Sequence, residues 1–314
     1  RPTGRPRQAR GLADALAADP SVAGLVYCSD WSAIALDAAG ADAKGVAACH
    51  RRYVRAVRAL ADMYRPGSAA RIQTAAQSEV ILARPSDYWI DVIDAGRHFR
   101  LADVQTAAGQ GDDEGERVGA VIAALMRCAD LAAADATIVL DDGDDGVLAM
   151  ARGFWAAGAG RGDFAAPSLA ALAPALPLRT GDGDDENAAF LVGDGPDAAK
   201  RKLKKSFCEP GTVSPNPPLE LARRLVEDGL VAALSVSRAP ENGGDAAYGP
   251  SDLGKLVDDF RSEALHPGDL KPAVVAALKD SVLAASAAGA AYPEAKADAA
   301  CLKALAKRLA KAKK

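Results

Sequence analysis

The segment at residues 200–211, KRKLKKSFCEPG, constrains the fold most, because it places a dense run of positive charge next to a strong helix stop. Its basic residues would surround all sides of a helix, which leaves Leu203 and Phe207, four residues apart, to pack on a core. Pro210 and Gly211 are expected to end that helix. A run of lysines is most often a solvated helix face, so the segment alone does not establish binding. It does divide the chain into two unlike parts.

The composition is that of a globular protein with an uneven distribution of charge. At 314 residues, 49% hydrophobic and 25% charged, the chain can bury one large core or two medium ones. Its net charge is −4, with acidic runs at 141–145 and 182–186 and basic runs at 200–205 and 303–314. Positive charge on the C-terminal third suits a polyanion bound in one orientation. A frayed or disordered Lys-rich end explains the last run equally well.

Several classes of protein find no support in the sequence. No apolar run reaches the roughly 18 residues of a membrane span, and the N-terminus lacks the apolar segment of a signal peptide. The missing initiator Met leads us to expect a fragment of a longer chain. We expect no metal site, because the alternating acids after residue 181 lack the Gly and Glu of a calcium loop. The cysteines form no CxxC pair and are expected to be reduced in a cytoplasmic protein.

Hydrophobic periodicity predicts strands and helices along the whole chain. Strands are expected at residues 22–29, 71–76 and 134–140, the first of them buried in a parallel sheet. Helices are expected at residues 49–64, 85–101, 118–133, 217–228 and 251–262, the last with Ser251 as its cap. Residues 230–237 form either a strand or a packed extended piece. Pro272 should bend or restart a helix, and helices at 274–288 and 299–310 should complete a bundle.

A second distinctive segment follows at residues 265–271, with the sequence LHPGDLK. Together the two segments resemble the C-terminal domain of archaeal and eukaryotic tyrosyl-tRNA synthetases, where a KLKKAFCEPG-like segment precedes an HPGDLK-like one. The resemblance includes residues 216–226 (NPPLELARRLV), Gly243-Gly244-Asp245 before Tyr248, and residues 290–293 (AAYP). These segments occur in the family's order, so the resemblance is specific for the last third of the chain.

The resemblance implies a division into domains. A degenerate class I synthetase domain of Rossmann-like α/β fold would cover residues 1–178, and an acidic linker at 179–198 would replace the KMSKS loop. An all-α anticodon-binding domain would cover residues 199–314. Residues 86–92, SDYWIDV, are similar to the insertion that forms most of the family's dimer interface. Trp89, Ile90 and Val92 would then be interface or core residues, and their composition favours the core.

The positions that perform catalysis in the family are altered here. Arg7 stands where the HIGH-like signature has the His that contacts ATP. Thr180 stands where the KMSKS lysine steadies the leaving pyrophosphate. Asp145 belongs to an acidic run that replaces a Gly-Gly-x-Asp-Gln loop and would repel the phosphates of ATP. Of the Tyr, Gln and Asp that read tyrosine, only Asp130 is retained, because Ala123 and Arg127 replace the other two.

We therefore expect no catalytic residue and no cofactor in this chain. ATP and tyrosine would be bound by a related catalytic half. No other enzyme site has a recognisable context in the sequence, since it contains no GxGxxG or P-loop and no recognisable Ser-His-Asp set.

The residues that read the anticodon in the family are better preserved. By resemblance, His266 would stack on the first anticodon base, and Asp269 would accept hydrogen bonds from the edge of a guanine. Helix capping is the alternative role for both side chains. Cys208 would line the same surface beside Lys271, whereas Asn242 replaces an aromatic residue that normally sandwiches the base. Phosphate contacts would come from the basic run, Lys200, Arg201, Lys202, Lys204 and Lys205.

This pattern resembles the second repeat of the double-length tyrosyl-tRNA synthetases of trypanosomatids. In those proteins two repeats form a pseudo-dimer, in which one repeat supplies the adenylation site and the other the anticodon site. The expected partners are therefore tyrosine tRNA and a catalytic half, with no membrane. The alternative is a scaffold or regulatory pseudo-synthetase that lacks specific tRNA binding.

Overall fold

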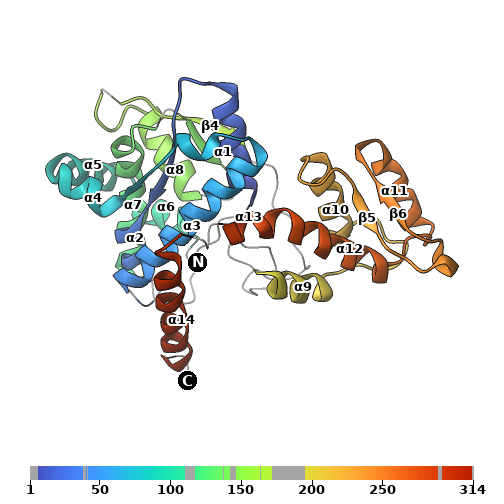
Figure 1. Cartoon of the computed structure of the whole chain (residues 1–314). Helices are drawn as coiled ribbons and strands as arrows, with labels where there is room; N and C mark the ends of the chain where they lie inside the picture. The colour runs from blue at the N-terminus through green and yellow to red at the C-terminus, as the bar shows by residue number, and fades with distance from the viewer. Residues whose placement is uncertain are drawn as a thin grey trace.

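The chain folds into an α/β body and a smaller, mostly helical body (Figure 1). The computed structural model describes residues 6–37, 40, 42–109, 117–136, 138–141, 146–162, 164–171, 195–288 and 292–312. Among these residues, no helix combines the length and the apolar content that a membrane span requires.

Two parallel strand pairs form the described sheet structure of the α/β body. In the first pair, β1 (Gly24–Cys28) lies beside β2 (Ile72–Ala76), with Gly24 opposite Ile72. In the second pair, β3 (Ile138–Asp141) lies beside β4 (Ser168–Ala171). Parallel neighbours need a long crossover, and helices supply it in both pairs. These crossovers contain α2 (Asp30–Ala35), α3 (Ala43–Tyr64), the 3-10 turn η2 (Ser68–Arg71) and α8 (Gly146–Ala156).

The remaining helices of this body are α1 (Pro6–Ala18), α4 (Gln77–Ala83), α5 (Pro85–His98), α6 (Leu101–Ala107) and α7 (Val118–Ala133). The strands expected near 22–29, 71–76 and 134–140 and the helices expected near 49–64, 85–101 and 118–133 are confirmed. Helix α3 begins earlier than its apolar periodicity indicates. The reason is a cap, because the Asp42 side chain accepts a hydrogen bond from the Gly45 amide at 3.0 Å.

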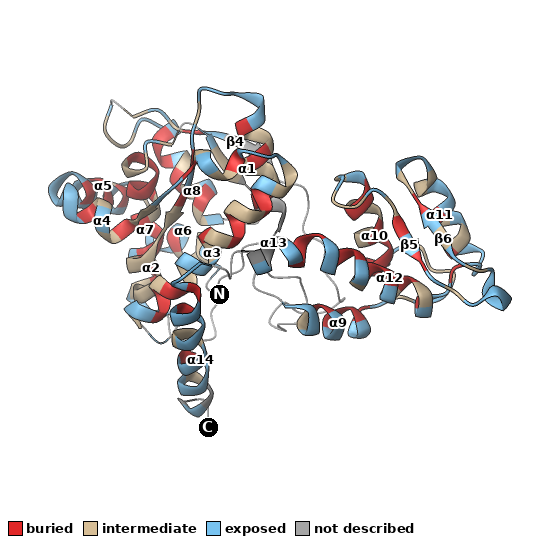
Figure 2. Ribbon diagram, in the orientation of Figure 1, coloured by how far each residue is buried: buried red, intermediate tan, exposed pale blue. Residues whose placement is uncertain are grey.

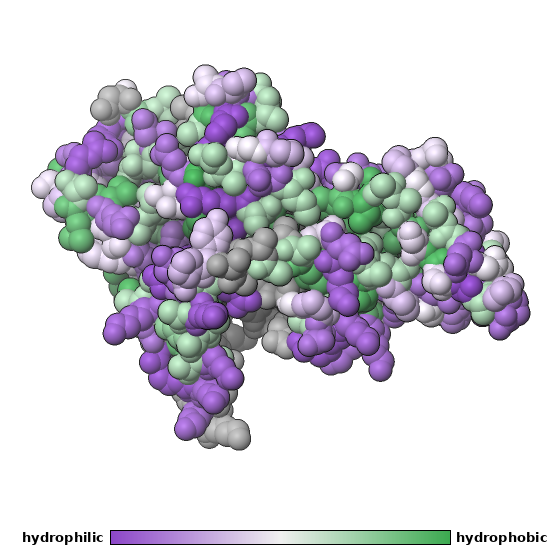
Figure 3. Space-filling view, in the orientation of Figure 1, coloured by the Kyte–Doolittle hydropathy of each residue, from purple (hydrophilic) through white to green (hydrophobic). Residues whose placement is uncertain are grey.

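One apolar stripe of α5 faces outward, although its composition favours the core. Val92 is buried, but Trp89 is 38% exposed, Ile90 52% and Ile93 59%. Neighbouring helices also carry exposed apolar side chains, and Figure 3 shows hydrophobic residues on the flank formed by α4 and α5. We call it the outer apolar face, and it comprises Leu82, Trp89, Ile90, Ile93, Leu101, Val118 and Ile122. The core role expected for Trp89 and Ile90 is therefore wrong.

The second body is mostly helical but not all-α. Strands β5 (Leu234–Val236) and β6 (Ala246–Tyr248) pair in an antiparallel hairpin, so the expectation of a purely helical domain is corrected. The hairpin is fixed from inside, since the fully buried Tyr248 donates a hydrogen bond to the Asp259 carboxylate at 2.7 Å. The other elements are α9 (Pro196–Lys205), α10 (Pro217–Glu227), the 3-10 turns η3 (Pro240–Asn242) and η4 (Pro250–Asp252), α11 (Leu253–Arg261) and α12 (Pro267–Asp280).

Two local expectations about these helices are also corrected. Helix α12 runs through Pro272 without a restart, because the missing amide lies near the helix start and deprives only the Gly268 carbonyl of its usual donor. Ser251 does not cap α11, since it lies in η4, and Asp252 is the residue at the cap position.

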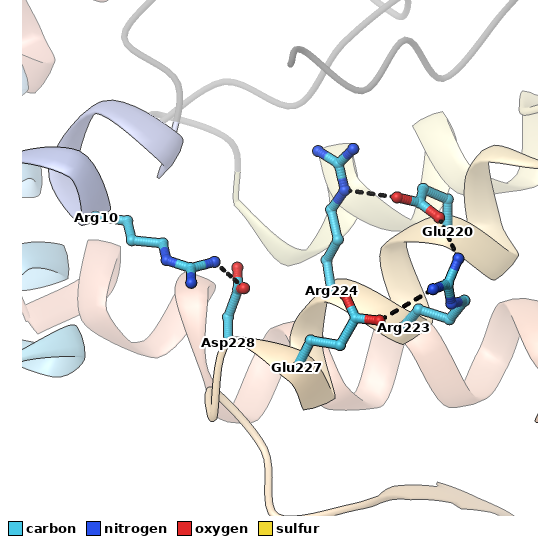
Figure 4. A network of polar contacts seen from close by, with 6 residues as sticks. All are labelled: Arg10, Glu220, Arg223, Arg224, Glu227 and Asp228. Atoms are coloured by element: carbon cyan, nitrogen blue, oxygen red, sulfur yellow. Dashed lines mark hydrogen bonds and ion pairs between the residues drawn. The ribbon is translucent and has the colours of Figure 1, made fainter. Parts of the chain in front are cut away.

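The last two helices return to the α/β body. Helices α13 (Val282–Ala288) and α14 (Ala295–Ala312) both pack on α3, although the sequence favours a bundle with their neighbours. One apolar core accordingly contains residues of α1 and α3 together with residues of α10, α12 and α13 (Figure 2). An ion pair between Arg10 of α1 and Asp228 at the end of α10 also joins the two bodies (Figure 4).

Candidate functional site

The start of α12 presents an exposed imidazole. His266 is the N-cap residue, and its Nδ1 accepts a hydrogen bond from the Gly268 amide at 3.0 Å. A Cβ at position 268 would lie 3.0 Å from this nitrogen, so glycine permits the close approach. The capping role that the sequence left open for His266 is therefore confirmed. The ring remains exposed, so capping does not exclude a second contact.

Asp269 behaves differently from its neighbour. Its side chain is half-buried in the first turn of α12, where the positive end of the helix dipole favours a carboxylate. Within the described parts of the chain, no amide or side chain donates a hydrogen bond to this carboxylate. The capping alternative thus has no support at Asp269, and an ionised carboxylate that only accepts hydrogen bonds is left beside His266.

The hairpin loop is tied to the segment that precedes His266. Arg238 donates to the Gly244 carbonyl at 2.9 Å and to the Ala264 carbonyl at 2.5 Å. Asp245 closes the loop, because the Arg238 amide and the Ser237 hydroxyl both donate to it at 2.9 Å and lower its pKa. Gly243 and Gly244 have φ values of +95° and +70°, which side chains rarely tolerate. Asn242, at the end of η3, is exposed on this loop.

Lys271 positions the end of α9 instead of pointing freely to solvent. Its ammonium donates to the Ser206 carbonyl at 2.9 Å and to the Lys204 carbonyl at 3.4 Å, which caps the last turn of α9. Cys208 follows two residues later and packs against the core. Burial raises the pKa of the Cys208 thiol, partly offset by the Lys271 charge. The structure therefore brings Cys208, Lys271 and the start of α12 together. The hydrogen bonds of Arg238 hold the loop that carries Asn242 next to Ala264, just before α12.

Helix α9 is shorter and more one-sided than its sequence indicates. It ends at Lys205, and Phe207 lies outside it, 37% exposed, so the expected packing of Phe207 is wrong. One face is buried through Ala199, Lys202 and Leu203, and Lys202 is only 2% exposed. A lysine buried in this way cannot reach a phosphate in this conformation. The exposed basic side chains of α9 are Lys200, Arg201, Lys204 and Lys205.

A buried polar cluster surrounds Asp130, which is 2% exposed on α7. Its Oδ1 accepts hydrogen bonds from the Tyr88 hydroxyl at 2.7 Å, the Gln77 amide at 2.8 Å and the Tyr27 hydroxyl at 3.0 Å. The donors come from β1, α4 and α5. Burial and the Asp130 charge raise the pKa of both tyrosines, so their hydroxyls stay protonated as donors. We call these residues, Tyr27, Gln77, Tyr88 and Asp130, the Asp130 cluster.

The cluster resembles a ligand pocket that the chain fills with its own side chains. The carboxylate already accepts two phenolic hydroxyls, the group that a tyrosine ligand would offer it. Gln77 is held in place by Ser32, whose amide donates to Oε1 at 2.8 Å and whose hydroxyl accepts from Nε2 at 2.9 Å. Sequence reasoning missed Tyr27, Gln77 and Tyr88, and it also missed Arg238, because no local motif marks any of them.

The structure describes only some of the other positions at which the sequence departs from the family's catalytic residues. Ala123 is buried and Arg127 is half-buried on α7, on the helix that carries Asp130. Arg7 lies in α1, and its side chain is outside the described part of the structure. Asp145 and Thr180 also lie outside the described residues. No group of three or more His, Cys, Asp or Glu residues that could hold a metal ion occurs among the residues that are described.

Curated proteins with related sequences are tyrosine–tRNA ligases. The cytoplasmic enzyme of Danio rerio is 37% identical over 109 residues, which is 33% of this chain and 20% of that protein. The enzyme of Aeropyrum pernix is 31% identical over 224 residues, which is 64% of this chain and 60% of that protein. The chain therefore spans less than two thirds of the length of these relatives. No family model matches it.

Solved structures extend the similarity to nearly the whole chain. Tyrosyl-tRNA synthetase of Leishmania major, in complex with tyrosinol, has a TM-score of 0.76 and 28% identity, covering 99% of this chain and 44% of that one. The Pyrococcus horikoshii enzyme has a TM-score of 0.76 at 19% identity, which supports the fold. Both neighbours are class I aminoacyl-tRNA synthetases, which is consistent with a Rossmann-like domain in this chain. The chain is therefore a homologue of the tyrosyl-tRNA synthetases of the archaeal and eukaryotic type.

Proposed function

We infer that the chain is the tRNA-reading half of a cytoplasmic tyrosine–tRNA ligase whose adenylation site lies in a related half. The observation that carries this inference is the Asp269 carboxylate, which has no hydrogen-bond donor within the described residues. It lies three residues after the exposed His266, and Arg238 ties the hairpin loop to Ala264, two residues before His266. The Leishmania chain is more than twice as long as the part matched here, which supports a repeat that acts with a partner.

The chemistry of these side chains suits a guanine at the first anticodon position. An ionised carboxylate can accept two hydrogen bonds at once from guanine N1–H and N2–H, whereas the Watson–Crick edges of the other bases do not present two adjacent donors. An exposed imidazole can stack on the face of the base, which contributes about 1–3 kcal/mol. We therefore assign recognition of the guanine to Asp269. His266 is assigned a contribution to the affinity for the tRNA through stacking.

Phosphate contacts are assigned to the exposed basic residues of α9. Lys200, Arg201, Lys204 and Lys205 project from the helix that Lys271 fixes beside the start of α12. Lys202 is excluded from this set because it is buried. These contacts would strengthen binding of every tRNA without selecting among sequences.

The substitution Asp269→Ala tests this assignment directly. We expect it to lose roughly 1–3 kcal/mol of discrimination between tyrosine tRNA and the same tRNA with another first anticodon base. The free energy of unfolding should change little, because the described structure gives the carboxylate no bond to lose. Filter binding measures the first quantity, and thermal unfolding measures the second.

Asp280→Ala is the matched control, since it removes an exposed carboxylate from the far end of the same helix. It should raise affinity for both tRNAs slightly and equally. If Asp269→Ala keeps full discrimination but lowers the stability of the domain, then the side chain is structural and the anticodon assignment is wrong.

The outer apolar face is assigned to the contact with the catalytic half. Large exposed apolar patches mark interaction sites in soluble proteins, and this one extends over α4 to α7. The expected result of Ile93→Asp is loss of the complex with the catalytic half, measured by sedimentation of the mixture. Ala276→Asp adds the same charge at an exposed position on α12 and should leave the complex intact. An unchanged complex with Ile93→Asp would place the partner elsewhere.

A scaffold or regulatory pseudo-synthetase is the second candidate. Asn242 favours it, because an exposed amide on the hairpin loop replaces an aromatic ring that could stack on a base. This candidate requires equal binding of the two tRNAs by the unmodified chain, so the filter-binding measurement separates it from the first. In both cases ATP and tyrosine belong to the partner half.

A further inference from the structure

The C-terminal helix α14 is amphipathic in charge as well as in polarity. Its inner face is held on α3 by Asp298, whose side chain is 3% exposed and ion-paired with Arg55 at 2.8 Å. Arg51 also donates to Asp298 at 3.0 Å, and these two arginines lower the pKa of the carboxyl. Farther along, Leu305 is buried so close to Gly45 that a Cβ there would lie 2.7 Å from it. The helix is therefore fixed in orientation.

The opposite face carries a row of lysines. Lys296, Lys303, Lys307 and Lys311 are all exposed, and their spacings of seven, four and four residues place them on one side of a helix. The row extends about 22 Å, at roughly 1.5 Å per residue. In the described part of the chain, none of these ammonium groups pairs with a carboxylate. We call these four residues the α14 lysine row.

The α14 lysine row destabilises helix α14 when no anion is bound to it. Lys303, Lys307 and Lys311 are like charges four residues apart, and like charges at this spacing destabilise a helix. The acidic residue in the first turn of α14, Asp298, is turned inward and neutralised by arginines, so it does not relieve the repulsion. An overall net charge of −4 makes an uncompensated positive row more distinctive. An external polyanion would supply the missing counter-charge.

We propose that the α14 lysine row is a second contact surface for the phosphate backbone of a structured RNA, distinct from the surface at α9 and α12. Alanines, Ala299, Ala300 and Ala304, separate the lysines on this face, and a membrane-binding helix would need large apolar residues there. Helices α9 and α14 lie on the same side of the molecule in Figure 1, and hydrophilic side chains cover much of both in Figure 3. The inference depends on the proposed function only for the identity of the RNA.

The test replaces Lys303 and Lys307 together by glutamine in the full chain. Two lost phosphate contacts should reduce the slope of log affinity against log salt by roughly 1.4–1.8 units for every tRNA. The ratio of affinities for tyrosine tRNA and its altered-anticodon variant should stay the same. Thermal stability should stay equal or rise, because the repulsion within α14 is relieved. The control variant replaces Lys255 and Lys279, two exposed lysines away from α14, and should keep the original slope.

The outcomes separate this inference from the proposed function. Equal binding of both tRNAs, with a slope that the α14 variant reduces, overturns the anticodon assignment and supports the lysine row. Preference for tyrosine tRNA, with a slope that only the control variant reduces or neither variant does, overturns the lysine row alone. Absence of RNA binding by the unmodified chain overturns both. Phosphatidylserine vesicles should not bind; vesicle binding that the α14 variant abolishes, without any effect on RNA, would assign the row to a membrane instead.

Discussion

The isolated chain is expected to give no tyrosine-dependent pyrophosphate exchange above buffer. In the family a His and a Lys stabilise the phosphates in the adenylation transition state, and the resemblance implies that Arg7 and Thr180 would replace them here. Loss of one such contact typically lowers the rate by on the order of 10²–10³. Two losses together correspond to about 10⁴–10⁶, before any defect in tyrosine binding is counted.

Tyrosine binding should fail for a separate reason. The acceptor that would receive the substrate hydroxyl is Asp130, and Tyr27 and Tyr88 already donate to it at 3.0 and 2.7 Å. A ligand would have to displace a buried tyrosine and break its hydrogen bond, which a single amino acid does not compensate. Titration calorimetry with tyrosine should therefore show no saturable heat.

The related catalytic half, assayed under the same conditions, is the positive control for both measurements. Adding this chain to it should not add a second exchange activity. Exchange by this chain alone, proportional to its concentration, would show that its own active site works and that the division of labour is wrong.

The elements predicted well are those whose signal is local. Helix α7 matches its expected range, 118–133, because apolar residues recur over its whole length and few competing signals interrupt it. Strand β1 is recognisable as a short apolar run between Pro20 and Asp30. The resemblance of residues 200–211 and 265–271 to a known family was also local, since it rests on contiguous motifs.

The features that escaped prediction depend on partners distant in sequence. Helix α9 ends at Lys205, before Pro210 is reached. There the ammonium of Lys271 donates a hydrogen bond to the carbonyl of Ser206, which lies 65 residues earlier in the sequence. The buried face of that helix includes Lys202, which composition alone assigns to solvent. The Asp130 cluster joins side chains that are 42, 53 and 103 residues from Asp130. No window of the sequence contains such a set, so only the folded chain reveals it.

The substitution Asp130→Ala should destabilise the α/β body by roughly 3–5 kcal/mol. It leaves the donors of Tyr27, Gln77 and Tyr88 without their shared acceptor in a buried site. Tyr88 and Gln77 retain weaker or other partners, since Tyr88 can donate to the Met126 carbonyl at 3.3 Å and Gln77 to the Ser32 hydroxyl at 2.9 Å. These remaining bonds keep the cost below the sum of three separate losses. Chemical denaturation measures the change.

Asp130→Asn is the conservative substitution to compare with Asp130→Ala. It keeps a side-chain oxygen at this position and removes the negative charge, so it tests the effect of that charge on stability. All three close donors meet Oδ1, and an asparagine oxygen can occupy that position, so we expect a loss below about 1.5 kcal/mol at pH 7. Burial raises the pKa of Asp130 above its ordinary value near 3.8, despite the hydrogen bonds that lower it. The ionised form of this carboxyl therefore opposes folding.

This opposition should disappear as the pH falls. The folded state binds a proton at a higher pH than the unfolded state, so stability is gained as the pH falls through the raised pKa, and the gain is complete below about 3.8. The free energy of unfolding of the unmodified chain should accordingly rise relative to that of Asp130→Asn as acid is added. A difference that stays constant with pH, or that changes in the opposite direction, would mean that the carboxylate is stabilised as an anion by its donors and that burial does not dominate this site.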